Sequence, residues 1–231
     1  MANYLIIGAS SGIGLALSNL LLSEGHSVWG TYHQHPLEAH SNLTPIALNV
    51  QEPTSGWESA LPDVLDGVAY CPGSIKLLPF GRIQAADFIN DYSLQVLGAI
   101  RVLQTVFTRL KKSTHPAVVL FSTVAVQTGM PFHSLVATHK GAVEGLTRAL
   151  AAEWAPSIRV NALAPSLTNT PLAAGLLNTE EKQQAAAQRH PLKRIAHATD
   201  MARSAYFLLT PESSFITGQI LPVDGGLSSI R

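Results

Sequence analysis

Hydrophobic residues along the chain fall into short runs that alternate with longer segments of helical period. Runs such as "NYLII" (3–7) and "AVVLF" (117–121) are bounded by polar or glycine-containing stretches, which favours buried strands. Between such runs, apolar residues recur every three or four positions, as they do on one face of an α-helix. This alternation is typical of an α/β fold in which helices cover both faces of a parallel sheet.

The pattern predicts about seven strands and about six helices. The strands are expected near 3–7, 27–31, 45–48, 66–70, 117–121, 158–162 and 219–222. The helices are expected near 12–24, 53–60, 85–112, 134–154, 179–189 and 199–209. No linker, repeat or low-complexity tract divides the chain, so we expect one domain over residues 1–231. Residues 171–199 are polar, alanine-rich and weakly periodic, which suggests a mobile lid over a substrate.

Composition narrows the classes of partner. The chain has 231 residues, of which 46% are hydrophobic, enough for a substantial core. Lys+Arg and Asp+Glu both number 15, and no basic block is present, which argues against nucleic acid or an anionic membrane as partner. Cys71 is the single cysteine, so an internal disulfide framework is excluded. The first apolar run is too short to span a bilayer and lacks a basic leader, so we expect a cytoplasmic protein.

The histidines do not change this picture. Most of the nine show no ligand pairing with nearby carboxylates or cysteines, and solvated surface positions are the simpler interpretation. We therefore predict no metal site.

The stretch "LIIGASSGIG" places three glycines directly between an apolar strand and an amphipathic helix. Gly8 permits a tight exit from the strand, Gly12 lets the backbone approach a diphosphate, and Gly14 lets the helix pack closely on the sheet. Ser10 and Ser11 add hydroxyl donors, and the start of the helix offers free N–H groups to an anion. A flexible turn is the alternative, but the flanking strand and helix favour a phosphate-binding loop.

With this spacing the loop resembles the glycine motif of the short-chain dehydrogenase/reductase family, which normally has Thr where this chain has Ile7. The resemblance extends over nearly the whole chain. "AEWAPSIRVNALAPSLTNTPL" (152–172) looks like the family's sixth strand and the loop that covers the nicotinamide, and "FITGQILPVDGG" (215–226) is similar to its C-terminal strand and turn. "DGVAYCPG" (66–73) occupies the place of the Asn-Asn-Ala-Gly motif, of which only Gly73 is kept.

The resemblance implies a Rossmann fold with a doubly wound parallel sheet, and a bound nicotinamide dinucleotide. The cofactor-binding residues that it implies are Gly8, Ser10, Ser11, Gly12, Ile13, Gly14, His33, Asn49, Val50, Cys71, Pro72, Gly73, Lys140, Pro165, Leu167 and Thr170.

The choice of cofactor depends on the end of the second strand, "SVWGTYHQ" (27–34). It lacks the acidic residue that would bind the adenosine ribose 2′-hydroxyl of NAD, which favours NADP. Yet no Arg stands at Thr31, Tyr32 or His33 to hold a 2′-phosphate, and Ser11 occupies a position that is basic in many NADP-dependent members. A cationic His33 would be a weak substitute. We favour NADP (NADPH) over NAD.

In the family, a Tyr four residues before a Lys gives or takes the substrate proton, while the Lys holds the nicotinamide ribose. Lys140 matches that Lys, but Val136 stands at the Tyr position and carries no proton to give. The family's Ser falls on Thr123, with Ser122 beside it, and the Asn that supports a water relay falls on Gln95. The resemblance therefore implies an altered active site.

His133 is the candidate to replace the missing phenol. It lies seven residues before Lys140, which returns to nearly the same helix face. Enoyl-acyl-carrier-protein reductases, a divergent branch of the same superfamily, carry their Tyr at that spacing. His139 points about 100° away from Lys140 around the helix and is a weaker candidate. A surface loop position is the alternative for His133. The catalytic residues predicted are Lys140, Ser122, Thr123 and His133.

The sequence thus predicts an atypical reductase that transfers a hydride from NAD(P)H to a small carbonyl or enoyl substrate. A non-catalytic nicotinamide-dinucleotide-binding protein, and an isomerase or dehydratase on the same fold, stay open as alternatives. The predicted helices 85–112 and 134–154 carry small residues suited to close packing, and the resemblance implies a homodimer or homotetramer built on them.

Overall fold

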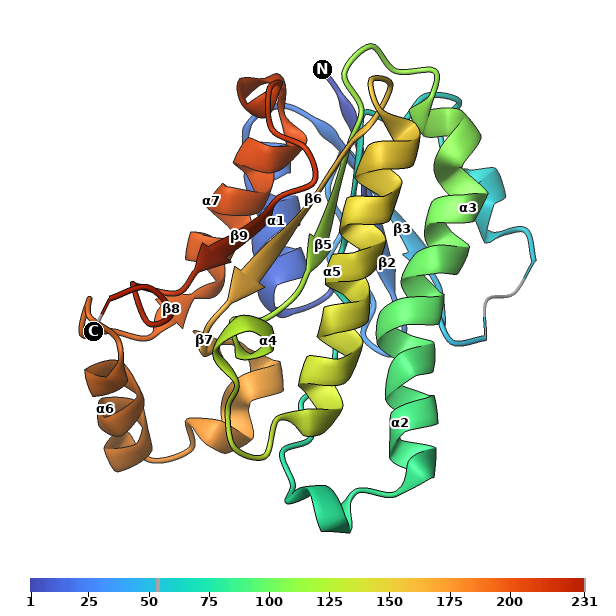
Figure 1. Ribbon diagram of the computed structural model, residues 1–231. Coiled ribbons are helices and arrows are strands. Elements are labelled where there is room, and N and C mark those ends of the chain that lie inside the picture. Colours follow the sequence, from blue (N-terminus) through green and yellow to red (C-terminus); the bar gives the residue numbers. More distant parts are fainter. Residues whose placement is uncertain (53–54, 231) are drawn as a thin grey trace.

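Parallel strands form the central sheet of the computed structural model, which describes residues 1–52 and 55–230 (Figure 1). The seven strands of this sheet, within the described residues, are β1 (Asn3–Ile7), β2 (Ser27–Tyr32), β3 (Leu43–Ala47), β4 (Gly67–Tyr70), β5 (Ala117–Phe121), β6 (Arg159–Pro165) and β9 (Ile220–Val223). Their spatial order is β3-β2-β1-β4-β5-β6-β9, and each neighbouring pair is parallel. A separate short ladder pairs β7 (Thr168–Asn169) with β8 (Ala196–His197).

Helices cover both faces of this sheet (Figure 1). The α-helices are α1 (Gly12–Ser23), α2 (Ala85–Tyr92), α3 (Gly98–Leu110), α4 (Ala125–Thr128), α5 (Ser134–Trp154), α6 (Glu180–Arg189) and α7 (Ala198–Leu209). Short 3₁₀ turns are η1 (Trp57–Ala60), η2 (Phe80–Arg82), η4 (Pro171–Leu176) and η5 (Pro211–Ser213). The apolar cluster under α1 and α7 lies on one face, and the cluster under α3 and α5 lies on the other. The predicted fold class, a doubly wound Rossmann fold, is confirmed.

Two predicted helices differ in detail from the structure. The helix expected near 53–60 begins at residues outside the described part of the chain, and its end forms the 3₁₀ turn η1. The helix expected over 85–112 is continuous, but a π-helical turn, η3 (Ser93–Leu97), separates α2 from α3.

The order in which strands are added to the sheet changes direction at β1. From β1 the chain adds β2 and β3 on one side, and then it returns to place β4 on the other side of β1. Ligands of open α/β sheets bind outside the carboxyl ends of the strands at such a switch point. The ends of β1 and β4 therefore mark the expected site.

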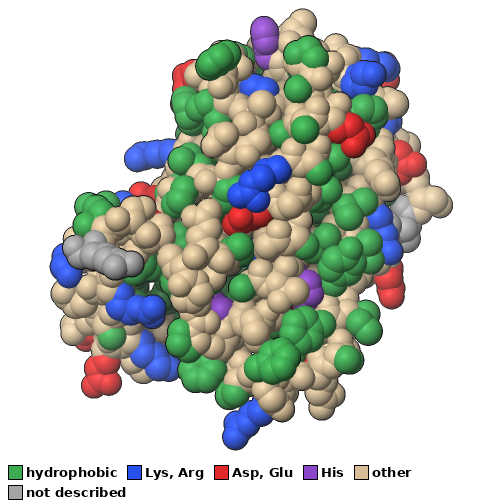
Figure 2. Space-filling model, viewed as in Figure 1, with side chains coloured by type: hydrophobic (Ala, Val, Ile, Leu, Met, Phe, Trp, Pro, Cys, Tyr) green, Lys and Arg blue, Asp and Glu red, His purple; other side chains and the backbone are tan. Residues whose placement is uncertain are grey.

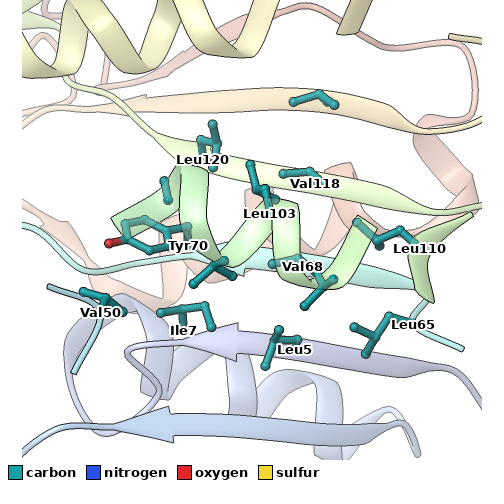
Figure 3. Close-up of a cluster of buried hydrophobic side chains, with 14 of the residues drawn as sticks. Leu5, Ile7, Val50, Leu65, Val68, Tyr70, Leu103, Leu110, Val118 and Leu120 are labelled. Atoms are coloured by element: carbon teal, nitrogen blue, oxygen red, sulfur yellow. The ribbon is translucent and has the colours of Figure 1, made fainter. Parts of the chain in front are cut away.

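The core explains why the strands read as continuous apolar runs rather than alternating ones. Strands covered on both faces bury every side chain. On the face under α3, Leu5 and Val68 pack with Val118 and Leu103, and all four are 3% exposed or less (Figure 3). Each such side chain contributes about 1.5–3 kcal/mol by leaving water. The sheet is thus a rigid base for the loops at its carboxyl edge.

The π turn is held in place by Tyr70 at the end of β4. The Tyr70 hydroxyl donates a hydrogen bond to the carbonyl oxygen of Leu94. A Cβ built on Gly98 would lie 2.3 Å from that hydroxyl, so only glycine fits beside it. π turns inside α-helices occur frequently at functional sites, and this one carries Gln95.

Among the described residues, no helix is long and apolar enough to cross a membrane.

Candidate active site

The glycine loop connects β1 to α1 in a conformation that requires glycine. Gly8 and Gly12 have φ of 77° and 53°, in the left-handed region. A Cβ on Gly14 would lie 2.1 Å from the carbonyl oxygen of Gly8. Ser11, the residue before α1, makes no side-chain capping bond. The first N–H groups of α1 thus have no capping side chain, as an anion-binding helix start requires.

A cavity of 460 Å³ opens beside this loop, at the switch point of the sheet. Ligand pockets have volumes of about 300–1,000 Å³. Its lining, over the described chain, contains no Asp, Glu, Lys or Arg. The predicted cofactor residues that line it are Gly8, Ser10, Ser11, Gly12, Ile13, Gly14, His33, Asn49, Val50, Cys71, Pro72, Gly73 and Thr170.

The loop after β6 faces the glycine loop across this cavity. A Cβ on Gly12 would meet the Cβ of Thr170 at 3.4 Å, and Pro171 and Leu172 also line the cavity. Free N–H groups at a helix start and the absence of lining carboxylates fit an anionic dinucleotide.

Three predicted cofactor residues are not among the described lining of the cavity: Lys140, Pro165 and Leu167. Pro165 ends β6, and its carbonyl oxygen accepts a hydrogen bond from the Val124 N–H at 3.1 Å. Lys140 Nζ lies 3.7 Å from the point where a Cβ on Gly73 would be, so the ammonium reaches the edge of the cavity.

Lys140 is buried, with 8% of the residue exposed. Desolvation lowers its pKa to about 8, although the negative charges of Asp91 and of an ionised Cys71 oppose the shift. Desolvation also raises the pKa of the Cys71 thiol to about 12. At neutral pH the site therefore holds one buried cation and a neutral thiol.

The two predicted hydroxyl residues occupy different surroundings. Ser122 is buried, and its hydroxyl donates a hydrogen bond to Glu144 Oε1 of α5 at 2.8 Å. Thr123 lies beside the carbonyl oxygen of Pro165, 3.4 Å from its Oγ1, at the carboxyl edge of the sheet. Thr123 is therefore the better placed of the two for a substrate that meets the cofactor at this edge.

His133 and Val136 lie at the start of α5. His133 precedes the first residue of α5, and its Nδ1 lies 2.7 Å from the carbonyl oxygen of Pro131. Val136 is 7% exposed and belongs to the buried side of the helix. The structure thus places His133 about one helical turn before Val136.

Sequence reasoning missed a buried polar cluster next to Lys140, which we name the Asp91 cluster: Ser74, Asp91, Gln95 and His139. The Asp91 carboxylate accepts from Gln95 Nε2 at 2.6 Å, from His139 Nδ1 at 2.6 Å and from the Ser74 hydroxyl. The spacing of Asp91 and Gln95, four residues apart on one helix, was the available signal. His139 was the weaker candidate because it points away from Lys140; in the structure it is hydrogen-bonded to Asp91, whose charge also acts on Lys140.

Within the described chain, no three His, Cys, Asp or Glu side chains are grouped as a metal site would need.

Comparison with known proteins agrees with this geometry. A family model described as "Enoyl-(Acyl carrier protein) reductase" matches residues 8–228. L-xylulose reductase of Bos taurus is 31% identical over 235 residues, covering 96% of this chain and 94% of that protein. The 3-oxoacyl-[acyl-carrier-protein] reductase FabG of Thermotoga maritima is 30% identical, covering 96% of each chain. A tropinone reductase homolog of Arabidopsis thaliana is 36% identical over 157 residues, which span 60% of that protein.

Solved structures show the same architecture. A short chain dehydrogenase family protein from Francisella tularensis superposes with a TM-score of 0.90 at 26% identity, covering 99% of each chain. The ligand-free aldohexose dehydrogenase of Thermoplasma acidophilum superposes with a TM-score of 0.91 at 27% identity, covering 100% of this chain and 94% of that one. With the family model spanning most of its length and two relatives matching it end to end, the chain belongs to the short-chain dehydrogenase/reductase family of NAD(P)-dependent oxidoreductases.

Proposed function

We propose that this protein is a reductase that uses NADPH to reduce a small carbonyl or enoyl substrate with an altered set of catalytic residues. The observation that carries the proposal is the cavity at the switch point, which is lined by the start of α1 and by Gly73, the residue next to the buried Lys140 ammonium. The names of the bovine and Thermotoga relatives favour a carbonyl, and the description of the family model favours an enoyl group.

A nicotinamide cofactor, when bound, supplies the hydride. The chain's own residues supply the rest. The glycine loop and the start of α1 hold the diphosphate, and Lys140 holds the nicotinamide ribose. Thr123 donates a hydrogen bond to the substrate oxygen. Because Val136 has no proton to give, His133 or a water molecule protonates the product, and an imidazole has the proton affinity for this task near neutral pH.

The preference for NADPH is supported by the end of β2. His33 and His35 both line the cavity there, and no carboxylate does, over the described residues. A carboxylate at this place would accept from the ribose hydroxyl of NADH and would repel a 2′-phosphate. The test is thermal stabilisation by each reduced cofactor, since binding to the folded state raises its stability. NADPH should stabilise more than NADH, and the double variant His33→Ala/His35→Ala should lose this difference. Equal stabilisation by both cofactors would contradict the preference.

Two further features belong to the same proposal. Residues 171–199 would act as a lid that closes on substrate, because α6 buries no residue and the segment follows the cavity-lining Thr170. The outer face of α3 and α5 would bind a second copy of the chain. Figure 2 shows this face, where hydrophobic side chains are scattered among uncharged polar and backbone atoms, and a basic side chain lies beside an acidic one near the middle.

The deciding experiment is oxidation of NADPH with a panel of carbonyls and enones. Turnover should appear with at least one substrate, and Lys140→Met should lower it by about 10²-fold or more, because the ribose is then no longer held in place. Lys112→Met, at an exposed position, is the matched control and should behave as the unaltered protein. Cofactor binding without any turnover would favour the alternative that Val136 suggests, a non-catalytic dinucleotide-binding protein.

A further inference from the structure

The Asp91 cluster lies where the loop after β4, the helix α2, the π turn and α5 meet. Its members come from four segments, and the side chains of Asp91 and His139 are each 5% exposed. The whole residues Asp91 and Gln95 are 6% and 1% exposed. A carboxylate that is buried with three donors around it is strongly oriented, because each donor fixes one direction of approach.

The orientation of the Gln95 amide follows from this carboxylate. The atom of Gln95 that lies 2.6 Å from Asp91 Oδ2 must be the NH₂ group, since two acceptor oxygens would repel at that distance. The amide oxygen is thereby turned the other way. Gln95 Oε1 is buried and has no hydrogen-bond partner. A buried acceptor without a partner is rare and indicates a ligand, a water or strain.

Gln95 Oε1 and the Lys140 ammonium both lie next to Gly73, which lines the cavity, although Gln95 and Lys140 are not themselves among its lining residues. From the position of a Cβ on Gly73, which lines that cavity, Gln95 Oε1 is 3.6 Å away and Lys140 Nζ is 3.7 Å away. One acceptor and one cationic donor therefore face the same small space. A hydroxyl group satisfies both at once, because it donates to the amide oxygen and accepts from the ammonium.

We infer that Gln95 Oε1 accepts a hydrogen bond from a hydroxyl of the nicotinamide ribose beside Lys140, and that Asp91, held by Ser74 and His139, is the positioning residue that turns the amide this way. The assignment rests on the proposed function, since it requires a nicotinamide cofactor in the cavity. Gln95 would thus contact the ribose from the π turn, whereas Val136 has no polar group that could form such a hydrogen bond.

Asp91 acts through Gln95 and does not itself touch the cofactor. Without the negative charge, the amide is free to turn its NH₂ group toward Lys140, where it would face the ammonium as a second donor. Two cationic or donor groups face Asp91 from α5, His139 directly and Lys140 through the field of its charge. The loop after β4 contributes the Ser74 hydroxyl, which donates to this carboxylate.

The test compares two probes by calorimetry. NADPH contains the nicotinamide ribose, and adenosine 2′,5′-bisphosphate lacks it. Gln95→Met, which keeps the shape but removes the amide, and Asp91→Asn should each weaken binding of NADPH about tenfold, the loss expected for one buried hydrogen bond. Both should leave binding of the bisphosphate within about twofold, which also shows that the variants are folded. Gln104→Met and Asp63→Asn, both at exposed positions, are the matched controls.

The double variant Gln95→Met/Asp91→Asn separates positioning from a merely structural role. If Asp91 acts through the amide, the second substitution adds no further loss of NADPH affinity, whereas independent effects would multiply. NADPH affinity unchanged in Gln95→Met would overturn the inference while leaving the proposed function intact. Failure of the unaltered protein to bind either NADPH or NADH would overturn both.

Discussion

Lys140 keeps a cationic side chain in a place that water hardly reaches. Its pKa of about 8 in the folded chain lies below the ordinary 10.5, and burial is the main cause. In the interval between these values the unfolded chain binds more protons than the folded one, so stability rises with pH there. Below a pH of about 8 the side chain is charged in both states, and the free-energy cost of burying the ammonium lowers stability in full. Lys140, the residue proposed to hold the ribose, therefore weakens the fold.

This cost can be measured with Lys140→Met. At neutral pH the variant should have a free energy of unfolding that is higher by on the order of 3 kcal/mol, because one pKa unit corresponds to about 1.4 kcal/mol. The advantage should shrink as the pH rises from about 8 to 10.5. Urea denaturation of both proteins across this range checks the prediction, and subtracting the curves removes the groups common to both. A variant that is less stable at neutral pH would contradict it.

Substitutions at His133 and Val136 test whether His133 acts as the proton donor in place of a tyrosine. His133→Ala should lower turnover by about 10²-fold or more if the imidazole is the general acid. The exposed His197→Ala is the control. Turnover within a factor of about two of the unaltered protein would remove that role from His133. Val136→Tyr should raise carbonyl reduction only if the pocket keeps the geometry of relatives that have the phenol.

At the scale of elements, the contact between β4 and the π turn is a tight fit. Gly98→Ala would drive a methyl group against the Tyr70 hydroxyl, at a built distance of 2.3 Å, and against Val50 at 3.2 Å. We expect a loss of about 1–3 kcal/mol in the free energy of unfolding, as for other overpacked sites. In a Tyr70→Phe background the same change should cost less, since the obstructing oxygen is gone. Additive losses in thermal or urea unfolding would disprove this coupling.

The lid offers a second test at this scale. α6 buries none of its residues, while α5 has eight buried ones, so α6 should open locally at a lower free energy. Amide hydrogens of α6 should exchange faster than those of α5 by about 10²-fold or more. NADPH together with substrate should slow the exchange in α6. Its C-terminal anchor is His190, whose Nε2 lies 2.9 Å from Ser166 Oγ, and His190→Ala should speed exchange further. Equal exchange in the two helices would contradict a lid.

For the whole molecule, the outer face of α5 bears on association. Gly145 is exposed there, and a Cβ built on it meets nothing within 4 Å, so Gly145→Glu does not disturb the single chain. If this face joins two copies, the unaltered protein should be a dimer or tetramer at micromolar concentration by light scattering, and the variant should be a monomer with unchanged folding. Ala185→Glu on α6 is the control. A monomeric unaltered protein would contradict the interface.

The sequence was sufficient for the architecture and for most of the cofactor cavity, for a physical reason. Strand runs such as 117–121 are visible in the sequence as continuous apolar stretches, and Gly8 and Gly12 take backbone angles that favour glycine. The Asp91–His139 pair could not be predicted in this way. The two residues are 48 positions apart, and their meeting depends on the rotation that the π turn introduces between α2 and α3.

Because of the π turn, one continuous helix can pack against the sheet with one part and against α5 with another, although the two contact faces point in different directions around the helix. A π turn holds one residue more than an α-helical turn, so it rotates everything before it by about 100° relative to everything after it. α3 can then seat Leu103 in the sheet core while α2 aims Asp91 at His139. Deleting a single residue from Ser93–Leu97 would restore an unbroken α-helical register and turn Asp91 away from α5. The contact between Asp91 and His139 thus depends on one extra residue in a helix that would otherwise only cover the sheet.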